Sequence, residues 1–134
     1  MDLLINIDVP DVARAERFYV EAFGLTPARR FGADGVELSG WASPVYLLAK
    51  ADGTVGAGHQ RRRYQRHWSP VHLDVVVDDI EAALARAVAA GATPEGEIRT
   101  DAWGRIVTLA DPFGHGLCLI QFLGRGYDEV ATPA

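Results

Sequence analysis

The sequence predicts an α+β fold made of two similar modules, each built as a strand, a helix and three further strands. The first observation is an internal repeat: residues 3–11 and 71–79 are both alternating apolar stretches that end in an acidic residue. Sliding one copy onto the other places Asp11 on Asp79, and an amphipathic helical pattern follows each of them. The second observation is that short stretches typical of strands follow each helical pattern. We therefore expect a cupped mixed sheet with the helices on its outer face.

The first module opens with a strand at about residues 2–9, where apolar residues alternate with Asn6 and Asp8. Asp11 is a good N-cap for a helix that runs to about Phe23. Two shorter strands are expected after this helix. They cover residues 35–39 and 44–49.

The second module repeats this plan. A strand over residues 71–77 places His72 and Asp74 on one face and apolar residues on the other. Asp79 caps a helix that ends near Gly91. Three strands are expected to complete the module. They cover residues 95–99, 105–110 and 116–122, with a turn at 111–114 before the last of them.

The whole chain of 134 residues is short enough to form a single domain, residues 1–134. Within it we expect four segments. They are a first βαβββ module (1–51), a linker loop (52–69), a second βαβββ module (70–123) and a tail (124–134) that lacks periodicity.

Composition narrows the class of protein. The chain is 49% hydrophobic and 23% charged, which is typical of a globular protein. A net charge of −5 argues against nucleic acid as a partner, and no stretch is apolar enough to predict a membrane span. The single cysteine, Cys118, cannot form an internal disulfide, and the N-terminus has no pattern of a signal peptide, so we expect a cytoplasmic protein.

Motifs spread over nearly the whole chain resemble the vicinal oxygen chelate superfamily, which includes glyoxalases, bleomycin-resistance proteins and extradiol dioxygenases. They lie at residues 7–11, 17–19, 23–25, 72–79, 89–92, 103–105 and 111–120. The resemblance implies paired βαβββ modules that form a cup, often completed by a second chain. It says less about chemistry, since this fold hosts many functions.

The resemblance also implies where a metal ion would bind. Metal-dependent members place ligands on the first and last strand of each module, which here gives Leu4, approximately Tyr46, His72 and Cys118. Only His72 is a good ligand, so we expect no metal cofactor. The open alternative is one divalent ion near His72, at a relocated site that adds Asp74 and either Asp8 or Cys118.

Polar side chains on the face opposite the helices predict a wet cavity. Asn6, Asp8, His72 and Asp74 share this face. His72 is either a general base or ligand donor, or a half-buried side chain bonded to Asp74. Asp8 and Asp74 either bind a ligand or are solvated at the rim. Cys118 fits an inert apolar role better than that of a nucleophile.

Aromatic and basic residues offer further ligand contacts. Trp41, Trp68 and Trp103 either stack against a planar ligand, or they fill the cup or a dimer interface. Trp103 and Arg105 are expected to share a strand face and to contact the ligand. The basic segment either binds an anionic substrate or is a solvated loop. It contains Arg61, Arg62, Arg63, Tyr64, Arg66 and His67. His115 is interpreted as a turn residue.

The leading functional interpretation is a metal-free protein that binds a planar or polycyclic small molecule, as drug- or metabolite-sequestering members do. Its ligand contacts come from Asn6, Tyr46, Trp68, Asp74, Trp103, Arg105 and Cys118, with His72 as the candidate catalytic residue. The alternative is a divalent-metal-dependent lyase, isomerase or dioxygenase of the same superfamily, and a third possibility is an interaction module without ligand. A homodimer is expected, because a cup with apolar edges is rarely left open.

Overall fold

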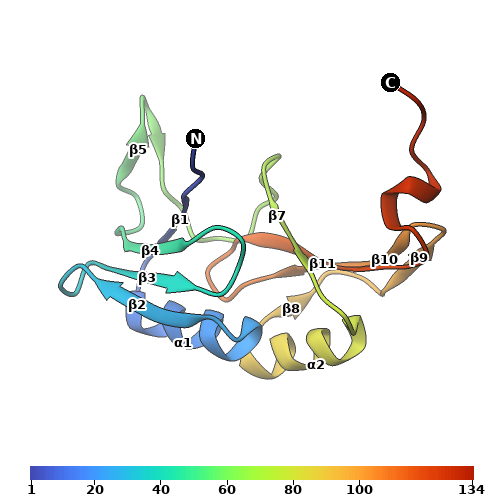
Figure 1. The fold of residues 1–134 in the computed structure, drawn as a ribbon. Coiled ribbons are helices and arrows are strands. Elements are labelled where there is room, and N and C mark those ends of the chain that lie inside the picture. Colours follow the sequence, from blue (N-terminus) through green and yellow to red (C-terminus); the bar gives the residue numbers. More distant parts are fainter.

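The computed structural model describes residues 1–134 and shows two sheets side by side, with two helices packed beneath them (Figure 1). The first sheet has the strand order β1-β4-β3-β2, and β1 runs parallel to β4. Its strands are β1 (Ile5–Val9), β2 (Thr26–Arg30), β3 (Gly35–Ser39) and β4 (Val45–Ala49).

The second sheet repeats this arrangement, with the order β7-β11-β10-β8 and β7 parallel to β11. A short strand, β9, also pairs with β10. The strands are β7 (Leu73–Val76), β8 (Thr93–Pro94), β9 (Arg99–Asp101), β10 (Gly104–Ala110) and β11 (Gly116–Phe122). The predicted α+β fold with two similar halves is confirmed.

Each helix begins at the acidic cap that the sequence predicted. The Asp11 side chain accepts a hydrogen bond from the Arg14 amide at the start of α1 (Val12–Phe23). Asp79 does the same for the Ala82 amide at the start of α2 (Ile80–Ala90). Neither helix is long and apolar enough to cross a membrane.

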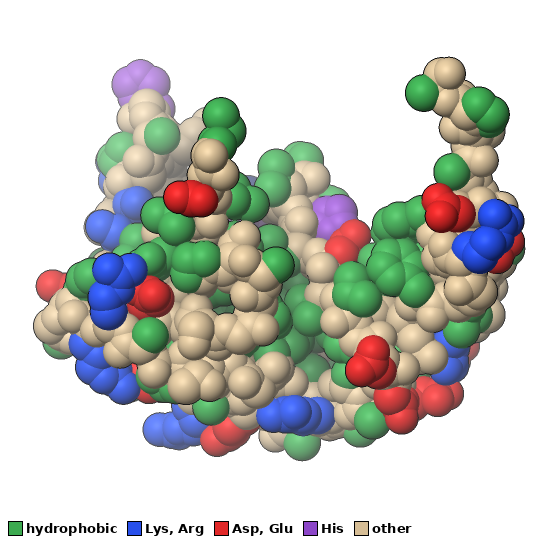
Figure 2. Space-filling view, in the orientation of Figure 1, with side chains coloured by type: hydrophobic (Ala, Val, Ile, Leu, Met, Phe, Trp, Pro, Cys, Tyr) green, Lys and Arg blue, Asp and Glu red, His purple; other side chains and the backbone are tan.

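The hydrophobic core lies between the sheets and the helices. Alternate residues of the strands, such as Ile7, Val9, Leu117 and Leu119, are buried against α1 and α2. The intervening residues therefore lie on the opposite face, which is the concave face of the cup. Figure 2 shows this upper face hollowed between the β5 hairpin on the left and the C-terminal segment on the right, with hydrophobic side chains along it.

Several elements differ from the prediction. The strand β2 was missed, because all five of its residues are exposed and its sequence contains a proline. The strand expected at 95–99 is replaced by β8, which ends just before that range, and by β9, which begins at its last residue, Arg99. The segment 52–69, expected to be a loop, contains a small hairpin of β5 (Val55–Ala57) and β6 (Gln60–Arg61). The tail contains one turn of 3₁₀ helix at Gly126–Glu129. The four-segment division itself stays a prediction.

Candidate functional site

The register of the second sheet brings three donor side chains together on the concave face. Cys118 of β11 lies directly between Asp74 of β7 and Thr108 of β10. His72 immediately precedes β7, and its Nε2 lies 3.2 Å from Asp74 Oδ1. Donor atoms of His72, Asp74 and Cys118 all lie within 4.8 Å of one another. This donor cluster was one of the relocated sets that the sequence suggested.

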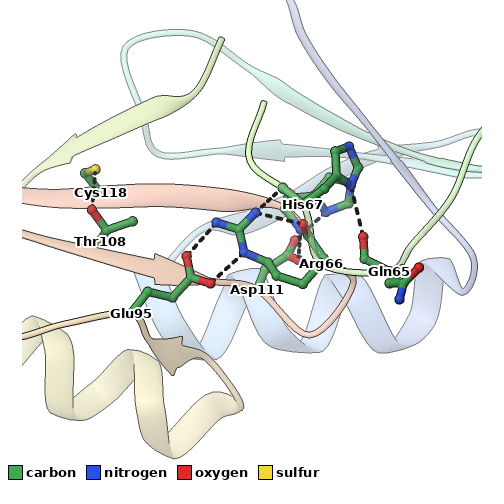
Figure 3. A network of polar contacts seen from close by, with 9 residues as sticks. Gln65, Arg66, His67, Glu95, Thr108, Asp111 and Cys118 are labelled. Carbon is green, nitrogen blue, oxygen red and sulfur yellow. Dashed lines mark hydrogen bonds and ion pairs between the residues drawn. The ribbon is translucent and has the colours of Figure 1, made fainter. Parts of the chain in front are cut away.

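The Cys118 thiol is held in its neutral form. Its side chain is buried, and burial raises the pKa of the thiol above its ordinary value of 9.0. The negative charge of Asp74 raises this pKa further, while the hydrogen bond with Thr108 opposes the rise. The Thr108 Oγ1 and Cys118 Sγ atoms are 3.5 Å apart and point toward one another (Figure 3). Cys118 is therefore a poor nucleophile at neutral pH.

An aromatic side chain lies beside the donor cluster. The Trp68 ring is tilted by 43° against the His72 ring, with 4.7 Å between the ring centroids. The Arg66 guanidinium lies 5.8 Å from the centroid of the same tryptophan. Gly116 makes this close approach possible, since a Cβ atom there would lie 3.0 Å from the indole ring. The structure thus places Trp68 against the concave face of the second sheet.

A cavity of about 660 Å³ lies where the two sheets meet, between β1 and β7. Apolar side chains from both sheets form much of its wall, among them Ile5, Ile7, Val71, Leu73 and Leu117. Its polar lining includes Asn6, Asp8, His67, His72 and His115. This volume is typical of a site for a small organic molecule. Three of the four histidines in the chain therefore face one cavity.

The structure gives His115 a different setting from the turn role that the sequence suggested. His115 is one of the residues that line the cavity, and its Nδ1 lies 2.7 Å from Oδ2 of Asp111. The Asp111 carboxyl is buried and also accepts a hydrogen bond from Tyr19 Oη at 2.8 Å. Burial and the charge of Asp111 raise the pKa of Tyr19 well above 10.0. In the sequence, the only sign of this network is the spacing of four residues between Asp111 and His115.

Residues of the first sheet do not join the donor cluster. Tyr46 lies on β4, where its hydroxyl accepts a hydrogen bond from Arg29 Nη2 at 3.1 Å. Leu4 is exposed and offers no donor atom. Asp8 lines the cavity, but its carboxylate is paired with Arg62 Nε at 2.7 Å. The relocated set that included Asp8 is therefore not assembled, and the ligand contact expected of Tyr46 has no support from its position.

The basic segment is largely engaged within the molecule. Arg62 binds Asp8, and Arg61 donates a hydrogen bond to the Gly53 carbonyl. Arg66 binds Glu95 through Nε and Nη2, as Figure 3 shows, and this contact lowers the pKa of Glu95. These pairs tie the segment to Asp8 on β1 and to Glu95 after β8, so Arg61, Arg62 and Arg66 do not form a free site for an anion.

The Tyr64 side chain fixes the same segment on its other side. Its hydroxyl donates to the Lys50 carbonyl at 2.7 Å, and its amide donates to Asp52. Arg66 also donates to carbonyls of the segment and of the β10–β11 turn, at His67 and Gly114. The linker is thereby anchored at both ends.

The expectation that Trp103 and Arg105 share a strand face is wrong. Trp103 lies in the two-residue turn between β9 and β10, and its ring contacts Phe122 and Tyr127. Arg105 lies on the helix side of β10 and forms an ion pair with Glu81 of α2 at 2.9 Å. Neither residue lines the cavity between the sheets.

Trp41 is likewise not a cavity wall. Its ring packs edge-on against Phe23 and Tyr19 of α1. Of the three tryptophans, only Trp68 lies beside the candidate site.

The residues present do not fit the four-ligand metal site of the superfamily. Leu4 has no donor and Tyr46 is bonded elsewhere, so the first module supplies no ligand. The three donors of the second module are close enough for one ion, but a metal would have to displace the thiol proton of Cys118 and the His72–Asp74 contact.

A family model described as a glyoxalase-like domain matches residues 4–120. An uncharacterized protein of Mycobacterium bovis is 31% identical, over 87% of this chain and 80% of its own length.

Solved structures show the same fold. A glyoxalase/bleomycin resistance protein/dioxygenase family enzyme from Burkholderia phytofirmans has a TM-score of 0.70 at 19% identity, covering 92% of this chain and 100% of its own. A lactoylglutathione lyase from Agrobacterium tumefaciens has a TM-score of 0.63 at 16% identity, with coverage of 90% and 92%. At these identities the likeness concerns the fold.

Proposed function

This chain belongs to the glyoxalase-like domain family of the vicinal oxygen chelate superfamily, and from that premise we propose that it binds a planar or polycyclic small molecule without a metal ion. The observation that carries the proposal is the cavity of about 660 Å³ between β1 and β7. Its wall combines apolar side chains with a few polar groups, which is the usual composition of a site for small organic molecules.

The aromatic character of the cavity edge supports a planar ligand. The rings of Tyr19, His67, His72 and His115 line the cavity, and Trp68 packs on His72. Flat side chains of this kind bury a large area against a planar molecule at little cost in conformational entropy. Asn6 on β1 and His72, which immediately precedes β7, supply polar groups from the two modules. Binding of this kind is enough to sequester a drug or a metabolite, because sequestration needs no catalytic step.

Equilibrium dialysis with 2-methoxynaphthalene tests the proposal, because this probe is planar and lacks a hydroxyl. We expect saturable binding of one probe per chain, and quenching of tryptophan fluorescence from Trp68. A Val71→Trp substitution at the exposed cavity edge should reduce binding, since the new indole fills the entrance. Val55→Trp is the control, because Val55 is also an exposed valine but lies on the β5 hairpin, outside the cavity lining. If Val71→Trp and Val55→Trp bound the probe with equal affinity, the probe would bind outside this cavity.

A metal-dependent lyase, isomerase or dioxygenase is the second candidate. One observation favours it, the clustering of His72, Asp74 and Cys118 within 4.8 Å. Metal analysis of protein produced with zinc, nickel, iron and manganese in the medium separates the two candidates. Stoichiometric metal that is lost in a His72→Ala variant would overturn the metal-free proposal. Metal content far below one ion per chain, in both proteins, would remove the enzyme candidate.

The expected homodimer remains a proposal. Apolar side chains at the concave face and its rim are exposed, among them Leu3, Leu4, Val71, Val76 and Phe122. A second copy laid against this face would cover them. Light scattering coupled to size exclusion should then report twice the chain mass of 14.5 kDa. A monomer at micromolar concentration would contradict this expectation.

A further inference from the structure

The turn between β10 and β11 holds a buried carboxylate surrounded by hydrogen-bond donors. Asp111 Oδ1 accepts from the amides of Phe113 and His115, at 2.8 and 2.9 Å. Oδ2 lies 2.8 Å from Tyr19 Oη and 2.7 Å from His115 Nδ1. The Asp111 side chain is completely buried, so these four groups are its whole environment of polar contacts.

This environment selects one form of the His115 ring. An ionised carboxylate only accepts hydrogen bonds, so the proton of a neutral imidazole must lie on Nδ1. The other ring nitrogen, Nε2, then carries a free lone pair and is an acceptor. Tyr19 does not compete as a proton acceptor, because burial and the charge of Asp111 keep its phenol protonated through a raised pKa.

The free nitrogen belongs to a residue that lines the cavity. The His115 side chain is 33% exposed, and its Nε2 makes no hydrogen bond within the protein. His72 differs in this respect, because its Nε2 faces Asp74, whose carboxylate is exposed and not enclosed by donors as Asp111 is. His67 is the remaining cavity histidine; its Nδ1 lies 2.9 Å from the carbonyl of Gln65, a neutral group on an exposed segment.

We propose that His115, held by Asp111, is a specificity-determining residue that accepts a hydrogen bond from a phenolic or enolic hydroxyl of the ligand. The inference rests on the proposed function and narrows it from planar molecules to planar molecules with an acidic hydroxyl. The hydroxyl donates to Nε2, and Nδ1 donates to Asp111. Where the hydroxyl is acidic enough, its O–H bond breaks, an Nε2–H bond forms, and the carboxylate of Asp111 stabilises the imidazolium beside the ligand oxyanion.

A pair of probes in which a methyl group replaces the hydroxyl proton tests this role. We expect the wild-type protein to bind 2-naphthol about tenfold more tightly than 2-methoxynaphthalene, which is the contribution of one good hydrogen bond. A His115→Phe variant should bind both probes with similar affinity, because it keeps a ring of similar size but lacks the acceptor. His59→Phe is the matched control; His59 is exposed on the β5–β6 hairpin, outside the cavity.

Each outcome of this measurement has a separate meaning. If neither probe binds to the wild-type protein, the proposed function fails and this inference falls with it. If both probes bind with equal affinity, the proposed function stands and the inference is overturned. If His67→Phe removes the preference and His115→Phe keeps it, the acceptor is His67 and the inference is again overturned.

Long-range ¹H–¹⁵N spectra of histidine-labelled protein give a readout that does not depend on affinity. In the free protein we expect the neutral His115 ring to show a protonated Nδ1 and an unprotonated Nε2. Adding 2-naphthol should move the Nε2 resonance of His115, whereas 2-methoxynaphthalene should leave it at the position of a free acceptor. An Nε2-protonated tautomer in the free protein would contradict the proposal without any ligand.

Discussion

At the scale of single residues, Cys118 is predicted to react slowly in the folded protein. Its thiol is buried, and both burial and the charge of Asp74 raise its pKa. Because the thiolate is the reactive form, we expect a thiol-specific disulfide reagent at pH 7.5 to modify the native protein far more slowly than the denatured protein. Absorbance of the released thiol measures both rates.

A second cysteine on the same face provides the control for this prediction. Val76 is 58% exposed on β7, so a Val76→Cys substitution in a Cys118→Ser background should react rapidly. If the native wild-type protein reacted as fast as this variant, the structural account of Cys118 would be wrong.

Sequence patterns predicted part of the site at this scale. The alternation in the two repeated strands placed Asn6, His72 and Asp74 on one face, and the contact between His72 and Asp74 was one of two open interpretations. The pairing of His115 with Asp111 was missed, because a four-residue spacing within a turn has no periodicity. The Asp111 carboxyl in this pair is buried beside Tyr19, which lies 92 residues away in the chain.

At the scale of elements, the turn before β11 is predicted to require glycine at position 114. Gly114 has φ of +91°, and a Cβ atom there would lie 2.5 Å from the Tyr64 carbonyl oxygen. We expect Gly114→Ala to lower the free energy of unfolding by about 1–3 kcal/mol, since both the backbone and the linker must shift. Urea unfolding followed by circular dichroism measures the loss.

The matched control separates backbone strain from the clash. Gly53 has φ of +79° but no atom within 4 Å of its added Cβ, so Gly53→Ala tests the strain alone. It should cost about 1 kcal/mol. Equal losses in the two variants would mean that the Tyr64 carbonyl does not restrict the turn.

The elements show which sequence signals are strong. Both helices begin at the predicted acidic caps, since a cap is a local contact that the sequence itself encodes. The strand β2 was missed because its position depends on pairing with β3 rather than on its own composition. The basic segment gave no sign of its partners, because Asp8 and Glu95 lie far from it in the chain.

At the scale of the whole molecule, the candidate site is a product of the duplication. The two sheets are built alike, and the cavity lies where their first strands, β1 and β7, approach one another. The repeat therefore predicted the two halves, but not the space between them. That space depends on how the 52–69 segment and the β10–β11 turn pack, which no local pattern describes.

The stability of the whole molecule is predicted to fall in alkaline solution. Cys118 and Tyr19 have pKa values raised by burial above their ordinary values of 9.0 and 10.0, at which they ionise in the unfolded chain. Between these values and the folded-state pKa values, the unfolded chain binds fewer protons than the native protein, so the free energy of unfolding decreases as pH rises. Below about pH 8 neither group contributes an appreciable slope. Each adds a decrease of up to about 1.4 kcal/mol per pH unit above its ordinary value.

Urea unfolding between pH 8 and pH 11 resolves the two contributions. Cys118→Ser should flatten the decrease that begins near pH 9, and Tyr19→Phe should flatten the part that begins near pH 10. Tyr19→Phe also removes a donor to the buried Asp111, which costs about 1–3 kcal/mol at any pH, so we expect the variant to be less stable than the wild type by this amount below pH 9 and by less above pH 10. The slope of the free energy of unfolding against pH distinguishes the titration of Tyr19 from the loss of its hydrogen bond, because only the titration depends on pH. A Tyr19→Phe variant with the wild-type slope above pH 10 would show that the Tyr19 phenol does not oppose alkaline unfolding.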